Sequence, residues 1–556
     1  MSKSKLRIIP LGGLDEIGKN MTAFEYGNEI ILVDCGMAFP DEDMPGVDMV
    51  INDISYLEKN KEKLKGIFLT HGHEDHIGGL PYFLKSINVP VYGTRLTIAL
   101  VEHKLKEHNL LSKVKVINVR AGNTVTIGKH FSIEFIRTNH SIADSVALAI
   151  TTPQGTVIHM GDFKIDSTPI VGDMIDLTRL GELGKRGVLA LMSDSTNVER
   201  GGYAMSERSV GEKFENIFKD CKKRIIVATF ASNVHRVQQI INAAAANGRK
   251  VAVSGRSMLN FVNAATRLGY LNVPDKMMID LNDAQKYPPE MVTIITTGSQ
   301  GEPMSALYRM AFGEHNQVSL GSNDLVVLSS SAIPGNEKLI TKIINELFKR
   351  GTEVITYSNY DVHVSGHACR EELKLIHSLT SPEFFMPVHG EYKHLIAHAG
   401  LAHEMGMREE KIVIPENGRV VEMSKRSLVP TGHVQAGAVM VDGTGSGEVS
   451  DVVLRDRKRL SEDGIIIVTA GVDLDFMTIS VYPEVISRGF VYEKENEDLI
   501  GRITESARNS LIRNLAKGID DIEVLRSKLR DDVAEYARKR TKHRPMIVVM
   551  LSDIQQ

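Results

Sequence analysis

The chain has 556 residues, of which 42% are hydrophobic and 24% are charged, and its formal net charge is −4. This length predicts two to four domains, and the net charge excludes a global basic field, so nucleic-acid binding would have to come from local patches. The three cysteines are scattered and form no CxxC pair or disulfide framework, which favours a reducing cytosol. We find no signal peptide and no apolar run near the ~18 residues of a membrane span, so we expect a cytoplasmic protein without a membrane partner.

The first segment, residues 1–206, alternates short apolar runs with glycine turns. Such runs predict buried strands, at residues 30–36, 66–69, 88–93, 131–137, 156–160 and 188–192. Polar residues that can bind a metal or transfer a proton follow three of them, namely His140, Asp162 and Asp194. One polar residue after a strand is ordinary turn chemistry, but the repetition predicts that several strand ends meet at one edge.

Residues 70–76, Thr-His-Gly-His-Glu-Asp-His, follow the predicted strand 66–69 directly. Imidazole and carboxylate groups together suit zinc or a similar divalent ion. His71 and His73 can face one ion, while Asp75 and His76 can reach a second one. Two ions roughly 3.5–4 Å apart would clamp a phosphate and generate hydroxide.

The alternative for this cluster is a solvated polar turn. Four potential ligands within six residues make that alternative the weaker one. His140 and Asp162, at the ends of later strands, are the candidates for a fifth and a sixth ligand. The sequence therefore predicts a dinuclear metal site.

The middle of the chain, from about residue 207 to 357, alternates strands with helices, which indicates a mostly parallel α/β domain. Strands are expected at residues 224–230, 250–254, 292–297 and 325–328, and helices at 234–247 and 337–350. Loops rich in Ser, Gly and Asn end these strands, at residues 230–233, 255–257, 298–302 and 329–336. Such loops can bind phosphate through helix N-termini, but they also commonly connect strands to helices in α/β domains that bind no phosphate.

The next segment returns to the first pattern. Residues 361–367 are rich in histidine, and an expected strand at 384–388 leads into His389. Histidines in the expected helix 393–406 are interpreted as ordinary surface or packing residues. Residues 366–445 would thus complete the first domain, and the α/β segment would be an insertion.

The last part of the chain predicts a small α+β domain. Strands are expected at 465–469, 476–482 and 546–551, and two amphipathic helices at 496–517 and 521–540. Basic runs at 455–459 and 538–544 are expected to be solvated, with an RNA or subunit contact as the alternative. Five glycines mark residues 437–450 as a linker. The predicted divisions are 1–206 and 366–445 for the first domain, 207–365 for the insertion, 446–450 for the linker and 451–556 for the C-terminal domain.

Several motifs resemble those of a known family. The cluster at 71–76, with Asp34, His140, Asp162 and His389, is similar to the metallo-β-lactamase motif series, and Asp194, His367 and the insertion resemble its β-CASP branch, whose members act on nucleic acids. The stretches that resemble bacterial ribonuclease J extend over essentially the whole chain: 11–20, 298–303, 363–367, 487–492 and 544–546. The implied fold class is α/β: a metallo-β-lactamase αββα sandwich with an inserted α/β β-CASP domain and a small C-terminal α+β domain for oligomerisation.

The resemblance also implies roles. Two Zn²⁺ ions per subunit are expected, with Mn²⁺ or Mg²⁺ as alternatives. One would be held by His71, His73 and His140, and the other by Asp75, His76 and His389, with Asp162 bridging. His367, oriented by Asp194, would protonate the leaving 3′ oxygen, and Asp34 would orient a metal-bound histidine. The predicted catalytic residues are therefore His367, Asp194 and Asp162, and the predicted RNA contacts are Ser232, Asn233, Ser331, His363, Val364, Ser365, Gly366 and His367.

The implied activity is that of a zinc ribonuclease combining 5′-to-3′ exonuclease and endonuclease activity in RNA maturation, rRNA processing and mRNA decay. The expected substrate is single-stranded RNA, preferentially 5′-monophosphorylated. Expected partners are a second copy in a homodimer or homotetramer, a paralogue in a hetero-oligomer, and other RNA-degradation proteins.

The sequence leaves two other functions open. A small-molecule hydrolase such as a lactamase can use the same metal scaffold, but it needs no large insertion. A catalytically weak scaffold subunit of an RNA-degradation complex is the second alternative, because some paralogues in this family have lost metal ligands. This chain retains every expected ligand, which favours a competent enzyme.

Overall fold

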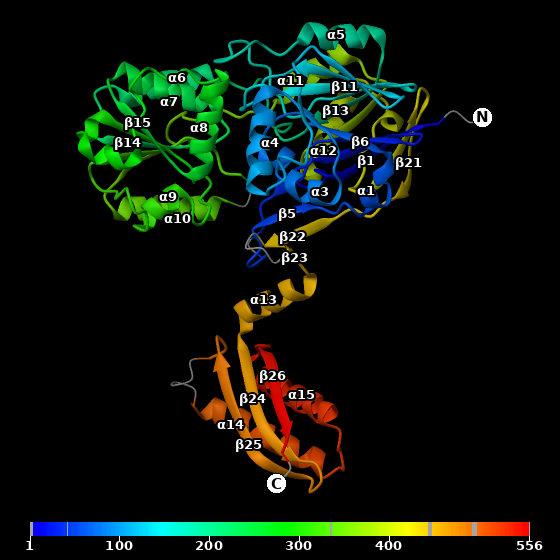
Figure 1. Cartoon of the computed structure of the whole chain (residues 1–556), viewed down its shortest axis with the longest axis vertical. Helices are drawn as coiled ribbons and strands as arrows, with labels where there is room; N and C mark the ends of the chain where they lie inside the picture. Colours follow the sequence, from blue (N-terminus) through cyan, green and yellow to red (C-terminus); the bar gives the residue numbers. More distant parts are fainter. Residues whose placement is uncertain (1–3, 42, 334–335, 443–446, 492–496, 555–556) are drawn as a thin grey trace. The chain divides into compact units, whose positions relative to one another are not determined.

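The computed structural model describes residues 4–41, 43–333, 336–442, 447–491 and 497–554 (Figure 1). The chain forms two compact units. The first contains Met1–Phe39 and Val50–Val439, and the second contains Pro40–Met49 and Met440–Gln556. None of the helices in the described residues is long and apolar enough to cross a membrane.

Two sheets face each other in the first unit. Central strands such as β3 and β13 are buried along their whole length, because each sheet is covered on both faces. The larger sheet runs in the order β21 (Ser427–His433), β20 (Arg419–Ser424), β1 (Leu6–Gly12), β2 (Met21–Tyr26), β3 (Glu29–Val33), β6 (Leu64–Phe68), β7 (Val91–Gly93) and β8 (Val116–Asn118). The smaller sheet runs in the order β19 (Phe384–Val388), β13 (Val188–Asp194), β12 (Gly155–His159), β11 (Val146–Thr152), β10 (Phe131–Arg137) and β9 (Thr124–Ile127).

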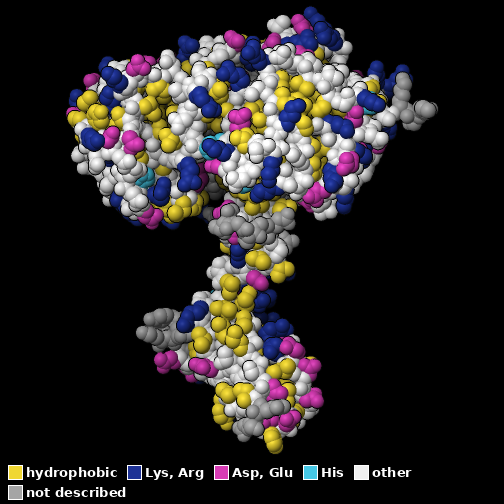
Figure 2. Space-filling view, viewed as in Figure 1, with side chains coloured by type: hydrophobic (Ala, Val, Ile, Leu, Met, Phe, Trp, Pro, Cys, Tyr) yellow, Lys and Arg dark blue, Asp and Glu magenta, His cyan; other side chains and the backbone are white. Residues whose placement is uncertain are grey.

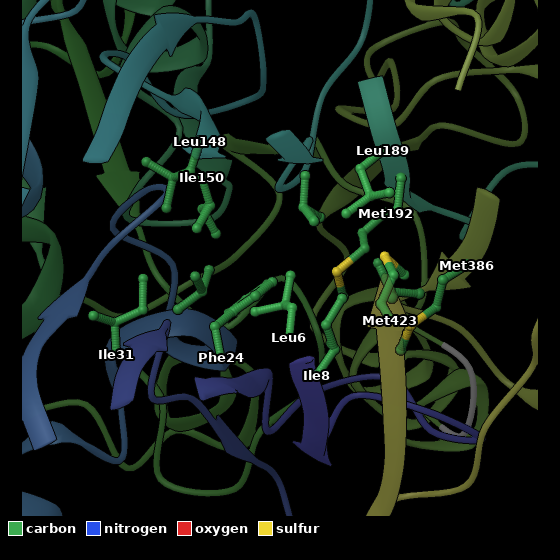
Figure 3. Close-up of a cluster of buried hydrophobic side chains, with 14 of the residues drawn as sticks. Leu6, Ile8, Phe24, Ile31, Leu148, Ile150, Leu189, Met192, Met386 and Met423 are labelled. Carbon is green, nitrogen blue, oxygen red and sulfur yellow. The ribbon is translucent and has the colours of Figure 1, made fainter. Parts of the chain in front are cut away.

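The core between these sheets is a layer of interdigitated apolar side chains. Phe24 and Ile31 of the larger sheet face Leu148 and Ile150 of the smaller one, and Met192 lies in the same layer (Figure 3). Helices cover the outer faces, so the expected αββα sandwich is present. The larger sheet carries α1 (Ser55–Lys59), α3 (Leu80–Ser86) and α4 (Arg95–Glu107), and the smaller one carries α5 (Leu177–Arg186), α11 (Arg370–Thr380) and α12 (Tyr392–Glu404).

A third sheet, wholly parallel, lies within the predicted insertion. Its order is β15 (Lys250–Ser254), β16 (Val292–Thr296), β14 (Arg224–Ala228), β17 (Asp324–Leu328) and β18 (Glu353–Thr356). Parallel strands need covering on both faces. One face packs on α6 (Arg208–Phe218), α7 (Val234–Ala246) and α8 (Arg256–Leu268), and the other on α9 (Ala306–Phe312) and α10 (Glu337–Lys349).

The chain re-enters the smaller sheet after this insertion. β19 pairs in parallel with β13, and Val388 lies opposite Asp194. Residues separated by nearly two hundred positions therefore end side by side. This pairing aligns the end of β19 with the ends of β12 and β13.

The second unit has a three-stranded sheet in the order β25 (Thr478–Arg488), β24 (Ile465–Asp473) and β26 (Met546–Asp553). Helices α14 (Glu497–Leu515) and α15 (Ile522–Thr541) pack their apolar residues on this sheet. The expected α+β character of this part is thus present. Its surface carries Lys and Arg side chains interspersed with acidic ones, as the surface of the first unit does (Figure 2).

Two local expectations in this part differ from the structure. The glycine-rich stretch expected to be a linker contains an antiparallel pair, β22 (Ala438–Asp442) with β23 (Gly447–Val449). Residues 443–446 lie outside the described residues. The basic run at 455–459 lies on a helix, α13 (Asp451–Asp463), that the sequence analysis missed. Ser450 caps this helix, and its side chain accepts a hydrogen bond from the backbone N–H of Val453.

Candidate metal centre

The carboxyl ends of five strands of the first unit meet at one place. The 71–76 cluster follows β6 of the larger sheet and ends in the short helix α2 (Glu74–Ile77). The smaller sheet contributes Asp194, the last residue of β13, and the loops after β10, β12 and β19, which bear His140, Asp162 and His389. Rigid strands thus present each side chain at or just beyond a strand end, the usual construction of an active site.

One group of donor atoms consists of three imidazoles and a carboxylate. Nδ1 of His73 lies 3.1 Å from Nε2 of His71 and 3.1 Å from Nε2 of His140. Oδ2 of Asp162 lies 3.6 Å from Nε2 of His71 and 3.7 Å from Nε2 of His140. Ligands around a tetrahedral zinc ion are separated by roughly 3.3 Å when each bond is about 2.0–2.1 Å, so these spacings fit one ion.

A second group adjoins the first. Nε2 of His389 lies 3.2 Å from Oδ2 of Asp75, and Nε2 of His76 lies 3.3 Å from Oδ1 of Asp162. Asp162 also approaches His389, at 3.5 Å. Asp162 belongs to both groups, the position of a bridging ligand, and its Oδ1 is buried without a hydrogen-bond partner among the described residues.

The outward nitrogens of the histidines have partners of their own. Nδ1 of His76 lies 2.8 Å from Oδ2 of Asp34, and Nδ1 of His71 lies 3.0 Å from Oγ1 of Thr70, which itself donates to Asp34. Partners of this kind fix the tautomer and orient the ring so that the other nitrogen faces the metal. Asp34 therefore lies behind the ligands, where an orienting residue belongs.

Two of the remaining three histidines, His140 and His389, follow the same rule. Nδ1 of His140 lies 2.7 Å from the carbonyl oxygen of Gly366, and Nδ1 of His389 lies 2.9 Å from Oγ1 of Thr196. A Cβ at Gly366 would lie 2.7 Å from the His140 ring, so only glycine permits this approach. His389 adopts a φ of 56°, an uncommon conformation that turns its side chain into the site.

The histidines of the two donor groups differ in the direction of their pKa shifts. Burial, reinforced by the neighbouring histidines, holds the pKa of His71 and of His140 well below the ordinary value. Burial also opposes the charge on His76, yet the carboxylates of Asp162, Asp75 and Asp34 raise its pKa well above the ordinary value. A cation that binds displaces such protons, and the donor set of imidazoles and carboxylates fits zinc.

A histidine–aspartate pair lies beside these groups. Nδ1 of His367 lies 2.7 Å from Oδ2 of Asp194 and 3.9 Å from Oδ2 of Asp162. Burial lowers the pKa of His367, but the Asp194 carboxylate outweighs burial and raises it overall. The side chain of His367 is 21% exposed, whereas that of Asp194 is 1% exposed, so the imidazole can reach a substrate while the carboxylate orients it.

The residues predicted to contact RNA differ in whether their side chains can reach a ligand. Nε2 of His363 lies 3.1 Å from Oγ of Ser331, and Ser365 accepts a hydrogen bond from Asn197 at 2.7 Å, so these segments lie together. The side chain of Val364 is in the core of the insertion, which leaves only its backbone for a ligand.

The other two predicted contacts precede α7. Asn233 is 2% exposed, and its side chain caps the helix by accepting from the backbone N–H of Arg236. Ser232 is half-buried in the loop just before it. These assignments remain predictions.

Sequence reasoning missed three residues that contact the ligands. Thr70 and Thr196 precede or follow motif residues and hold the outward nitrogens of two histidines. Asn20 places its side-chain nitrogen 3.1 Å from Nε2 of His76 and donates to the carbonyl of Asp75. Thr70 and Thr196 adjoin the motifs and were open to detection. Asn20 ends the 11–20 motif of the family resemblance, but that motif alone does not indicate a contact with His76.

Comparison with known families agrees with this geometry. The model described as "Metallo-beta-lactamase superfamily" matches residues 14–178, and "Zn-dependent metallo-hydrolase RNA specificity domain" matches 355–415. "Ribonuclease J, beta-CASP domain" matches residues 222–347, and "Ribonuclease J C-terminal domain" matches 452–554. Three of the four models thus concern RNA-directed enzymes.

Relatives that match over their full length identify the family of this chain. The chain is 41% identical over 549 residues to ribonuclease J2 of Bacillus subtilis, with 99% of each chain covered. The chain belongs to the ribonuclease J family. It is also 43% identical to ribonuclease J of Synechocystis sp., over 98% of this chain and 86% of the relative, and 42% identical to ribonuclease J of Thermus thermophilus, over 98% and 94%.

Membership of the ribonuclease J family confirms the resemblance, the fold class and the identification of the chain as a metal-dependent, RNA-hydrolysing enzyme. One solved structure, a protein of unknown function from Enterococcus faecalis, matches with a TM-score of 0.52 and 16% identity, over 75% of this chain and 100% of that one. That likeness concerns the fold alone.

Proposed function

We propose that this ribonuclease J family member is a dizinc ribonuclease that combines 5′-to-3′ exonuclease and endonuclease activity, and that it serves RNA maturation, rRNA processing and mRNA decay. The observation that carries the proposal is the pair of donor groups that share Asp162. Two metal sites a few Å apart suit the displacement of a phosphodiester. The histidine–aspartate pair of His367 and Asp194 at the same place supplies an acid for the leaving group.

In this proposal, His71, His73 and His140 hold one zinc ion, Asp75, His76 and His389 hold the other, and Asp162 bridges them. Bound zinc ions supply an activated water and neutralise the charge on phosphate. Three imidazoles in one group favour zinc over Mg²⁺, and Mn²⁺ is the alternative with similar ligands. Asp34 and Thr70 keep the rings oriented from behind.

His367 acts as the general acid that protonates the leaving 3′ oxygen. Asp194 holds its Nδ1 at 2.7 Å, so the proton is available at Nε2, the nitrogen that remains free to meet the substrate. The raised pKa keeps this imidazole protonated more readily than a free histidine. Asp194 is thus a positioning residue for His367.

The substrate is single-stranded RNA with a preference for a 5′ monophosphate. His363 lies on the segment that carries His367, and its Nε2 lies 3.1 Å from Oγ of Ser331 in the loop after β17. These polar groups can hold a phosphate close to the site of cleavage. Ser232 and Asn233 precede the first turn of α7, where backbone N–H groups favour anions.

Labelled RNA tests the activity. One sequence would be prepared with a 5′ monophosphate, with a 5′ triphosphate and as a closed circle. We expect mononucleotide release that is fastest from the monophosphate, and internal cuts in the circle. Hydrolysis of a chromogenic lactam with all three RNAs left intact would instead support the small-molecule hydrolase, and RNA binding without metal or cleavage would support the scaffold.

We further propose that the protein works in the cytoplasm as a homodimer or homotetramer, with a paralogue or other RNA-degradation proteins as additional partners. The C-terminal α+β fold, whose exposed apolar residues include Val481 and Met550, supports a role in oligomerisation. Removal of residues 451–556 should lower the mass measured by light scattering to that of a monomer. An unchanged oligomer would contradict this assignment.

A further inference from the structure

Arg236 is a fully buried cation in the first turn of α7, with 0% of its side chain exposed. Its Nε and Nη2 donate to the two carboxylate oxygens of Glu207 at 2.8 and 3.1 Å. Its Nη1 donates to the carbonyl and hydroxyl oxygens of Ser329, each at 2.7 Å, and to the carbonyl of Val362 at 2.9 Å. One guanidinium therefore binds three segments that are far apart in the sequence.

Two of these segments lead directly to the proposed phosphate-binding residues. Ser329 follows β17 and stands two positions before Ser331, and Val362 immediately precedes His363. Ser329 also donates to the carbonyl of Val362 at 2.6 Å. Arg236 thus fixes the point from which both halves of the His363–Ser331 pair extend.

Glu207 connects this cation to the metal-binding loop. Its backbone N–H donates to Asp166 at 3.1 Å, and Asp166 lies 3.7 Å from Lys164, which in turn donates to the carbonyl of Met205. All three ionised side chains are nearly completely buried. Asp166 and Lys164 follow the proposed bridging residue Asp162 closely in the same loop, so the buried polar contacts that begin at Arg236 extend to the loop that carries Asp162.

Stability alone does not account for this arrangement. The removal of two charges from water costs several kcal/mol per ion, and replacement of a buried pair by apolar residues is often neutral or stabilising. A planar, two-pronged guanidinium fixes its partners in distance and angle far better than apolar packing does. The contacts of Arg236 therefore favour a role in geometry.

We propose that Arg236 and Glu207 are positioning residues that set the spacing between the metal centre and the site for the 5′ phosphate. This spacing determines that cleavage falls one nucleotide from the 5′ end. The inference rests on the proposed function, because it concerns the end selectivity of that same activity. Cuts within a chain do not use the phosphate site, so they need the metal centre but not this spacing.

The test compares Arg236→Lys with Arg249→Lys. Arg249 is a matched control, because it is a buried arginine of the same domain, 3% exposed. Among the described residues its guanidinium donates to three backbone carbonyls, those of Cys221, Lys223 and Val292. Each protein would receive one RNA sequence as a 5′ monophosphate, as a 5′ hydroxyl and as a closed circle. Product lengths, kcat and KM would be recorded, with the melting temperature as a measure of folding.

We expect Arg236→Lys to reduce the preference for 5′ monophosphate over 5′ hydroxyl by about tenfold or more, since small displacements of a bound group have effects of this size. Its products should become mixed in length, while cleavage of the circle stays close to wild type. Arg249→Lys should lower the melting temperature but leave preference and product length unchanged.

The inference is overturned if a folded Arg236→Lys retains end preference and mononucleotide products, or if cleavage of the circle falls as much as cleavage from the end. If Arg236→Lys fails to fold, Arg236→Met combined with Glu207→Leu replaces it, because this pair leaves no unpaired buried charge; it must show the same loss of preference. Wild-type protein that cuts no RNA would refute the proposed function itself, which is a distinct result.

Discussion

Nε2 of His389 lies 3.2 Å from Oδ2 of Asp75, although 314 positions separate the two residues. The parallel pairing of β19 with β13 creates this contact. The second donor group is therefore complete only when β19, which follows the insertion in the chain, pairs with the smaller sheet.

The pair of His367 and Asp194 leads to the first prediction. His367→Gln should lower kcat for RNA cleavage by about 10²- to 10⁴-fold, the usual contribution of a general acid, and should leave the zinc content unchanged. Asp194→Asn should have a smaller effect of the same kind, because it leaves the imidazole in place but removes its charged partner. Single-turnover kinetics and metal analysis of the same preparations would check both results. Loss of zinc from His367→Gln would show that this residue is a ligand instead.

Gly366 leads to a second prediction. In Gly366→Ala the new methyl group would lie 2.7 Å from the His140 ring, and a ring held by its neighbours cannot easily move away. We expect zinc affinity and RNA cleavage to fall together, as measured by a chelator titration and by gel assay. Gly400→Ala in α12 is the control, because nothing lies within 4 Å of its Cβ, and alanine should stabilise that helix by about 0.5–1 kcal/mol. Equal activity of the two variants would contradict the packing described for Gly366.

His398 leads to a prediction about pH. This residue is 3% exposed, Nδ1 lies 3.0 Å from Oγ of Ser195, and burial lowers its pKa to about 3. A histidine that is neutral in the folded state and ordinary in the unfolded state gives stability above the unfolded pKa of about 6.5, and this stability is lost as pH falls toward 3. Between pH 7.5 and 5 the loss should amount to about 2 kcal/mol.

Urea denaturation of wild type and of His398→Gln, at pH 7.5 and at pH 5, would measure this loss. The difference between the two proteins removes the contribution of the metal ligands, which both share. The variant should be less stable at pH 7.5 but should lose less stability on acidification. Parallel loss in both proteins would show that His398 does not carry this pH dependence.

The strands that carry the ligands were predictable because each signal is local. An apolar run followed at once by a ligand residue identifies β6, β10, β12 and β19, and the periodicity of the insertion identifies its parallel sheet. The ligand candidates could be named for the same reason. Their mutual distances could not, since they depend on a strand pairing that spans the insertion.

The residues that sequence reasoning missed act through tertiary contacts. Asn20 reaches His76 from a distant loop, and Arg236 looks like an ordinary helical arginine until its burial among three segments is seen. Val364 was predicted to contact RNA as part of the 363–367 motif, but successive side chains alternate in direction there and that of Val364 turns into the core. Whether a side chain is buried and which residues it contacts depend on how neighbouring elements pack, which the local sequence does not show.

Zinc analysis of wild type and His76→Ala, combined with cleavage and binding of the same RNA, tests the central claim most directly. His403→Ala, an exposed histidine on α12, is the control. We predict two zinc ions per chain in wild type and in the control, as a dinuclear hydrolase requires. His76→Ala should contain fewer ions and cut no RNA, yet bind RNA almost as wild type does. Full zinc content or unchanged cleavage in His76→Ala would contradict the account.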